Sequence, residues 1–333
     1  MEFNEFKEEL VKFMSERYPD VEFHVNDIVK NNGLHLTGIA GISPDKNAGP
    51  NIYINELYEK VAEGAMTFGA AATIVEQRYI MASKESINIE KDIFDYEKVK
   101  DKLICRLVNK KLNSESLQEV PHKIVGSDLA VTYRYLHAKD ENGVASALIC
   151  NKQLETWGVS VDELHKVALY NTERLFPAKM NSLLSTVKDI LFEGLLPEDD
   201  LLKQEINDEI ELYEGQDVQL YVLTNDVGLN GATAILYPSV QEAIEKRFGE
   251  DVYILPCSIH ETMVAINCDD EAFLLDMVRT ANQEAVRMED YLADSIYQVK
   301  DGELVNVNQF EVEIEEVLEE SYGEITDEFD AEM

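Results

Sequence analysis

Residues 218–268 read VQLYVLTNDVGLNGATAILYPSVQEAIEKRFGEDVYILPCSIHETMVAINC. A capping box of Ser239 and Glu242 predicts a helix inside this stretch. Asp269 and Asp270 predict the start of a second helix directly after it. The expected order, β-β-α-β-β-α, joins neighbouring strands by hairpins, so we expect an α+β fold with antiparallel-rich sheets and packed helices. The strands are expected at four short apolar runs, 220–223, 232–237, 252–255 and 262–266.

The chain before residue 178 carries helix and strand patterns of its own. Apolar residues at helical spacing follow Phe3, and a capping box of Ser160 and Glu163 predicts a later helix. Strand-like runs lie between them, at 21–25, 34–39, 51–54, 129–135 and 144–149, and the turn signal Asn31-Asn-Gly33 predicts a hairpin of the first two. We therefore expect two halves, an N-terminal α+β domain at 1–177 and a C-terminal α+β domain at 218–307. The second of these domains should end in a hairpin around Asp301-Gly302.

Two acidic segments lie outside these domains. Residues 178–217 are expected to form an acidic linker or helical connector, because 193–217 contain ten acids and a single base, Lys203. The tail, 308–333, has eleven acids and no base from Glu311 onward. Its apolar residues still fall near helical spacing, so both a frayed tail and an amphipathic helix that docks on a partner are consistent with it.

The charge balance restricts the choice of partners. The chain has 66 acids against 29 bases, which gives a formal net charge of −37. This charge repels phosphate backbones, so nucleic-acid binding is disfavoured and a basic protein partner is favoured.

Cysteine usage and hydropathy predict the compartment. The four cysteines are scattered without a C-x-x-C pair, which is typical of free thiols in a reducing compartment. The first residues lack the basic and apolar regions of a signal peptide, and no apolar run is long enough to span a bilayer. We expect a soluble cytoplasmic protein without a membrane segment, and the sequence predicts no particular oligomeric state.

The turn Cys257-Ser-Ile-His-Glu261 holds the candidate catalytic residues. Ser258 or Cys257 supplies a nucleophile, His260 a base and Glu261 an orienting carboxylate, the residue types of a hydrolase. Catalytic partners usually converge from separate parts of a fold, however, and spacing within one turn seldom gives the required geometry. The competing interpretation, which we favour, is that Ser258 and His260 bond turn amides while Cys257 packs as a small apolar group.

Metal and cofactor signatures are weak throughout the chain. Cys257, His260 and Cys268 have no standard ligand spacing, and the His-Glu pair lacks the second histidine of H-E-x-x-H. The glycines of Gly228-x-x-Gly231 are too close together for a dinucleotide or P-loop signature. We predict no metal and no cofactor.

Four segments carry a resemblance to a known family: NIYINELYEKVAEG, ETWGVSVDELHKVALYNTERLFP, LYVLTNDVGLNGATAILYP and VYILPCSIHETMVAI. They resemble a domain family of unknown function from anaerobic Gram-positive bacteria, over about residues 1–307. The last motif of that family typically reads L-P-S-S-I-H-E, so Ser258, His260 and Glu261 match it. Cys257 replaces the first serine, which counts against Cys257 as an obligatory nucleophile. The resemblance implies no activity.

Together these observations favour a non-enzymatic interaction or regulatory protein with a strongly acidic surface. One alternative is a hydrolase that uses Ser258, His260 and Glu261. The other is a DNA mimic that occupies the nucleic-acid site of a basic partner, which requires carboxylates spaced like phosphates along one face.

Overall fold

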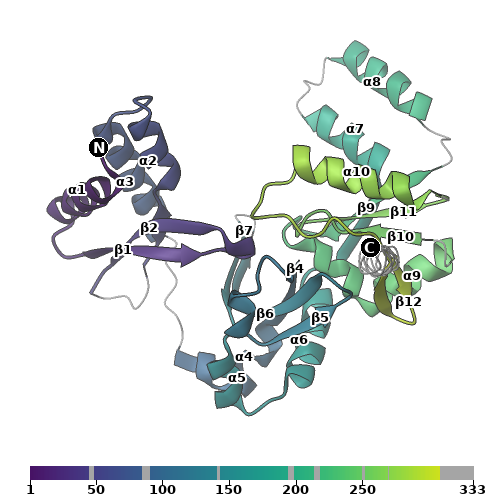
Figure 1. Ribbon diagram of the computed structural model, residues 1–333, viewed down its shortest axis with the longest axis horizontal. Coiled ribbons are helices and arrows are strands. Elements are labelled where there is room, and N and C mark those ends of the chain that lie inside the picture. Colours follow the sequence, from purple (N-terminus) through teal and green to yellow (C-terminus); the bar gives the residue numbers. More distant parts are fainter. Residues whose placement is uncertain are drawn as a thin grey trace, which may run out of the picture. The chain divides into compact units, whose positions relative to one another are not determined.

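The structure is a computed structural model that describes residues 1–44, 49–84, 91–140, 143–193, 199–213, 218–249, 252–268 and 270–307. By contact density the chain forms two compact units, Met1–Val99 and Lys100–Met333. The described residues form three antiparallel sheets with helices packed on them (Figure 1), which confirms the predicted α+β class. No helix in these ranges is long and apolar enough to cross a membrane. The predicted acidic tail, 308–333, lies outside the described residues.

The first unit packs helices on a three-stranded sheet of order β1-β2-β3. The hairpin predicted from Asn31-Asn-Gly33 is confirmed, and both Asn32 and Gly33 have the positive φ that such a tight turn requires. Phe6, Leu10 and Met14 are buried along one face of α1, at the spacing that predicted this helix. The unit contains α1 (Phe3–Arg17), β1 (Glu22–Val29), η1 (Asn31–Gly33), β2 (His35–Ile42), β3 (Asn51–Tyr53), α2 (Asn55–Ala62), α3 (Phe68–Lys84), η2 (Lys91–Phe94) and α4 (Tyr96–Val99).

The second unit begins with a four-stranded sheet built around the long strand β6. One edge of β6 pairs with β4, and the other pairs first with β5 and then with β7. The predicted cap of α6 is present, because Ser160 Oγ accepts from the Glu163 amide at 3.2 Å. These elements are η3 (Lys100–Lys102), β4 (Leu103–Asn109), η4 (Ser116–Gln118), β5 (His122–Val125), β6 (Leu129–Asp140), β7 (Gly143–Leu148), α5 (Asn151–Trp157) and α6 (Val161–Leu175).

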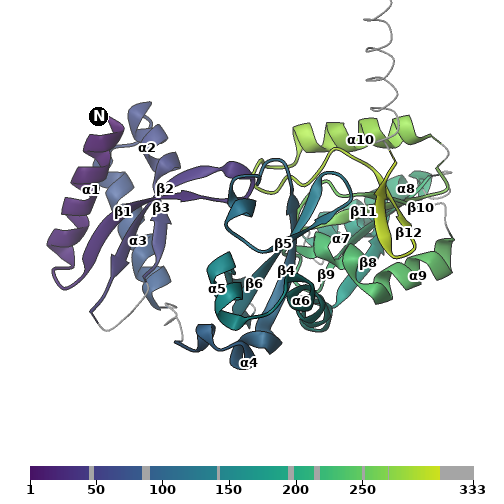
Figure 2. The ribbon, with the colours of Figure 1, turned by 60° about the horizontal axis from the view of Figure 1, so that its bottom comes forward.

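A six-stranded sheet of order β13-β12-β10-β11-β9-β8 completes the second unit. Figure 2 shows α10 on one side of this sheet and α9 on the other. The predicted hairpin around Asp301-Gly302 joins β12 to β13. The elements are β8 (Ala178–Ser182), α7 (Leu183–Glu193), α8 (Asp200–Tyr213), β9 (Gln219–Asn225), η5 (Gly231–Leu236), α9 (Pro238–Phe248), β10 (Val252–Leu255), β11 (Thr262–Ile266), α10 (Glu271–Glu284), β12 (Tyr297–Lys300) and β13 (Glu303–Asn306).

Two local predictions in the stretch 218–268 are wrong. The run predicted as a strand at 232–237 lies in the 3₁₀ helix η5, because periodicity alone does not separate a short buried strand from a buried helical turn. Ser239 does not cap α9; that helix begins after Tyr237 with Pro238 in its first turn, and the Ser239 hydroxyl donates to Glu173. The helix predicted to start at Asp269 and Asp270 is α10; Asp269 lies outside the described residues, and the Asp270 carboxylate accepts from the Phe273 amide at 2.9 Å.

The compact units divide the chain at a different place from the predicted domains at 1–177 and 218–307. Residues 178–182, expected in the connector, form strand β8 and pair with β9. The rest of the acidic stretch contains α7 and α8, while 194–198 and 214–217 are not described. Residues 100–177 therefore fold with the C-terminal half rather than with residues 1–99.

Candidate functional site

The turn that carries the predicted site is clamped by a later segment of the chain. Leu292 donates its amide to the Cys257 carbonyl at 3.0 Å, and Ala293 donates to the Pro256 carbonyl at 3.0 Å. The Ile259 amide in turn donates to the Asp290 carbonyl at 2.8 Å. Three main-chain bonds therefore fix the turn independently of its side chains.

Both ring nitrogens of His260 are engaged. Nδ1 accepts from the Asn230 amide at 3.2 Å, so this nitrogen carries no proton and the proton lies on Nε2. Nε2 faces Asp290 Oδ1 at 3.1 Å, and the other oxygen of Asp290 accepts from Arg287 Nη2 at 2.7 Å. His260 therefore links the loop before η5 to the 287–290 segment, and its imidazole is held between two partners.

The other residues of the predicted site do not converge on this ring. Ser258 Oγ accepts from the main-chain amide of His260 at 3.0 Å, and no described contact joins it to the imidazole. Burial raises the pKa of the Cys257 thiol to about 12, so the thiol stays protonated at neutral pH. Glu261 is exposed and makes no described hydrogen bond to His260. This geometry favours a structural role for the turn, and catalysis by Ser258, His260 and Glu261 stays a prediction.

The loop before η5 approaches the same turn so closely that a glycine is required in it. A Cβ on Gly231 would lie 2.1 Å from Thr224 Oγ1 and 2.5 Å from the His260 carbonyl oxygen. Thr224 Oγ1 donates to that carbonyl at 2.8 Å, and the Ala232 amide donates to the Ile259 carbonyl at 3.2 Å. Two of the segments that carry the family resemblance therefore meet in space.

The loop is also stiffened by its own first residue, Asn225. The Asn225 carboxamide accepts from the amides of Val227 and Gly228 at 3.0 and 2.8 Å, and it donates to the Leu229 carbonyl at 2.8 Å. Asn230 then adopts the left-handed conformation with φ 54°. Local side-chain bonds of this kind are why asparagine is favoured in such turns.

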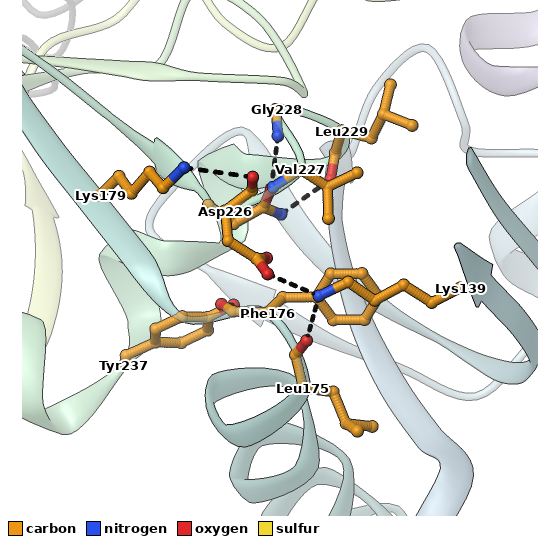
Figure 3. Close-up of polar contacts among 10 residues, drawn as sticks. Lys139, Leu175, Phe176, Lys179, Asp226, Val227, Gly228, Leu229 and Tyr237 are labelled. Carbon is orange, nitrogen blue, oxygen red and sulfur yellow. Dashed lines mark hydrogen bonds and ion pairs between the residues drawn. The ribbon is translucent and has the colours of Figure 1, made fainter. Parts of the chain in front are cut away.

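Lys139, near the end of β6, anchors the loop from outside (Figure 3). Its Nζ donates to Asp226 Oδ2 at 2.7 Å and to the Leu175 carbonyl at 2.6 Å, where α6 ends. The same ammonium lies 4.5 Å from the centre of the Phe176 ring. The loop thus has a fixed position over the end of the four-stranded sheet.

Sequence reasoning missed two arginines beside this loop, Arg106 on β4 and Arg134 on β6. They line a small cavity together with residues of the loop. Burial is the main cause that lowers the pKa of Arg106, to about 10, and it also lowers the pKa of Arg134. Both side chains remain charged at neutral pH. The available signal was an arginine within each of two otherwise apolar strands, LICRLVN and LAVTYRYL.

Helices α7 and α8, which lie in the acidic stretch, expose several apolar side chains. No residue of α7 is buried. The side chains of Val187, Ile190, Leu191 and Leu202 are 39%, 63%, 47% and 46% exposed. Exposed acids lie on the same two helices, at Asp189, Glu193, Glu205 and Asp208. On α7 the apolar residues Val187, Ile190 and Leu191 lie at i, i+3 and i+4, on one side of the helix. We call the eight exposed residues of the two helices together the α7–α8 face.

No group of His, Cys, Asp or Glu within the described ranges is placed to hold a metal ion. A model of a family of unknown function, DUF5688, matches residues 3–300 of the chain. Comparison with curated proteins gives no match, and comparison with solved structures gives none either.

Proposed function

The chain belongs to DUF5688, a family of unknown function, and we propose that it is a non-enzymatic interaction protein that binds a basic, amphipathic segment of a protein partner. The observation that carries this proposal is the α7–α8 face, which presents four large exposed apolar side chains among carboxylates. Apolar side chains gathered on adjacent helices and left exposed are typical of an interaction surface. An amphipathic partner helix covers such a surface with its own apolar stripe.

Charge decides which partner fits this face. With 66 acids against 29 bases, the chain attracts a cationic segment and repels an acidic one. A second copy of the chain carries the same excess of acids, and so does its own segment 308–333. A partner with Lys and Arg beside an apolar stripe matches both the acidic and the apolar residues of the α7–α8 face. Its charges accelerate association, and burial of its apolar side chains supplies affinity.

The geometry of the predicted catalytic turn supports a binding role over hydrolysis. A general base needs a ring nitrogen within reach of the nucleophile, and both nitrogens of His260 already have partners. The apolar residues of the α7–α8 face also favour a protein partner over mimicry of a phosphate backbone. We place the protein in the cytoplasm, which its four free cysteines support.

Binding to a designed peptide tests the proposal directly. A synthetic helical peptide with a leucine stripe and flanking lysines should bind the protein, and added salt should weaken this binding by screening the charges. Replacement of both Ile190 and Leu191 by Ser should weaken binding by about tenfold, because it removes the most exposed apolar contacts of α7. Fluorescence anisotropy of the labelled peptide measures both effects.

A matched control is available in the same unit. Ile124 and Phe273 are 46% and 52% exposed outside the α7–α8 face, so their joint replacement by Ser should leave peptide affinity unchanged. The same peptide with Glu in place of Lys should not bind. Equal affinity of the Ile190→Ser, Leu191→Ser variant and the unmodified protein would contradict the proposal, as would equal binding of the acidic and basic peptides.

A further inference from the structure

We propose that Arg106 and Arg134 form a binding site for one compact oxyanion, a carboxylate or phosphate group, beside the 225–231 loop. The two arginines share a small cavity with Ser146, Thr172, Asn225 and Asn230. The cavity is small, with a volume of about 20 Å³, so it can hold no more than one small group. This site is independent of the α7–α8 face.

Strand register brings the two arginines together. Ile104 of β4 lies opposite Arg134 of β6, and Arg106 lies opposite Thr132. Directly opposed residues share a face of the sheet, and so do residues two apart along a strand. Arg106 and Arg134 are therefore diagonal neighbours on one face, where their like charges act on each other.

Arg106 lacks a partner for a buried donor. Its Nε is buried and has no hydrogen-bond partner, and the described residues provide no ion pair to either arginine. Arg134 is fixed differently, since its Nε donates to Ser146 Oγ at 2.8 Å and its Nη2 donates to the Ser146 carbonyl at 3.0 Å. One arginine is thus held in place, and the other presents an unused donor.

The nearest acids are occupied elsewhere. Asp290 and Glu289 act electrostatically on Arg106. The oxygens of Asp290 bond to His260 and Arg287, however, and Glu289 Oε1 pairs with Arg287 Nη1 at 3.0 Å. The negative charges of these carboxylates reduce the free-energy cost of burying the Arg106 guanidinium, but neither carboxylate bonds to it directly.

A bound anion would neutralise the buried positive charge of Arg106 and Arg134 and accept a hydrogen bond from the unpartnered donor. A guanidinium stays protonated at neutral pH, so a buried arginine cannot escape its desolvation cost by losing its charge. Its planar array of donors matches the oxygens of a carboxylate or a phosphate. The net charge of −37 repels anions from the molecule as a whole, so a specific response to an anion requires a local site such as this one.

Anion-dependent stabilisation tests the site. Thermal unfolding is followed while sodium phosphate or sodium acetate replaces a sodium salt of a bulky sulfonate at constant ionic strength. The unmodified protein should show a saturable rise in Tm with at least one of the two anions, because an anion that binds only the folded state stabilises it. Calorimetric titration with the same anion should give one site, with affinity at least about tenfold weaker in Arg106→Met.

The variants separate specific binding from a general salt effect. Arg279→Met removes the same charge from an exposed position on α10 and should respond to the anions as the unmodified protein does. Arg106→Met should unfold in bulky sulfonate at a Tm no lower than that of the unmodified protein, since it removes an unpaired buried donor. Equal anion responses in all three proteins, or absence of a saturable response in the unmodified protein, would each overturn the proposal.

Discussion

At the residue scale, His260 joins its own turn to two segments that are distant in sequence. Its Nδ1 accepts the Asn230 amide, its Nε2 faces Asp290, and its carbonyl accepts the Thr224 hydroxyl. Each of these bonds satisfies a group that is partly withdrawn from water. The imidazole therefore forms a hydrogen-bonded bracket, that is, a link that holds the 225–231 loop to the 287–290 segment. This structural role requires neither a nucleophile nor a substrate.

Replacement of this bracket should cost stability. We expect His260→Ala to lower the free energy of unfolding by about 2 kcal/mol, because it leaves the Asn230 amide and the Asp290 carboxylate without their partner. Urea denaturation followed by circular dichroism measures the change. Glu261→Ala is the matched control and should change the free energy by less than about 0.5 kcal/mol, since Glu261 is exposed. Equal stability of His260→Ala and the unmodified protein would contradict the bracket.

The sequence identified the turn that contains His260 but not the partners of the ring. Ser258 and His260 were expected to bond turn amides, and the Ser258 hydroxyl does accept such an amide. Asp290 lies 30 residues from His260, and Arg106 is farther still, so no local pattern connects them. The burial of an arginine in a strand cannot be predicted from the local sequence, because strand register and the covering loop determine its environment.

At the element scale, two amides on the outer edge of β4 bond to threonine side chains rather than to another strand. The Cys105 amide donates to Thr172 Oγ1 of α6 at 2.8 Å, and the Leu107 amide donates to Thr233 Oγ1 of η5 at 3.1 Å. Side-chain hydroxyls thus replace a ladder of main-chain bonds, and they protect an edge that otherwise invites pairing with another chain. This arrangement also explains why 231–235 are buried without belonging to a sheet.

The threonine of η5 provides a clean test of this edge. Thr233→Val keeps the shape of the side chain but removes the acceptor for the Leu107 amide, so it should lower the free energy of unfolding by about 1–3 kcal/mol. Thr156→Val on the exposed side of α5 makes the same chemical change and should cost less than about 0.5 kcal/mol. Equal effects of the two substitutions in urea denaturation would show that the hydroxyl of Thr233 does not support β4.

Local signals predicted elements well where the bonds themselves are local. The caps at Ser160 and Asp270 and the turns at Asn31–Gly33 and Asp301-Gly302 all depend on neighbours within a few residues. Strand β8 and helix η5 were misassigned, because their conformations depend on β9, β4 and the 256–261 turn. Composition alone made 178–182 look like the start of an acidic connector.

At the scale of the whole molecule, the two compact units have separate cores. One core gathers Phe6, Leu10, Met14 and their neighbours between α1, α3 and the three-stranded sheet. Other apolar clusters, including one formed by Tyr253, Leu274 and Val278, lie entirely within residues 100–307. A unit with its own core has the main requirement for folding alone. Because β4 to β7 and α6 also belong to the second unit, a fragment that begins after residue 177 would lack its four-stranded sheet.

We therefore expect the fragment 100–333 to unfold cooperatively without residues 1–99. Its thermal transition should be sharp, because the buried clusters that stabilise it are complete within the fragment. The fragment 178–333 is the informative comparison. It lacks β4, β6 and α6, so it exposes the Tyr237 and Thr233 contacts of η5 and should give a broad transition or aggregate. Cooperative unfolding of 178–333 would instead favour the predicted division of the chain after residue 177.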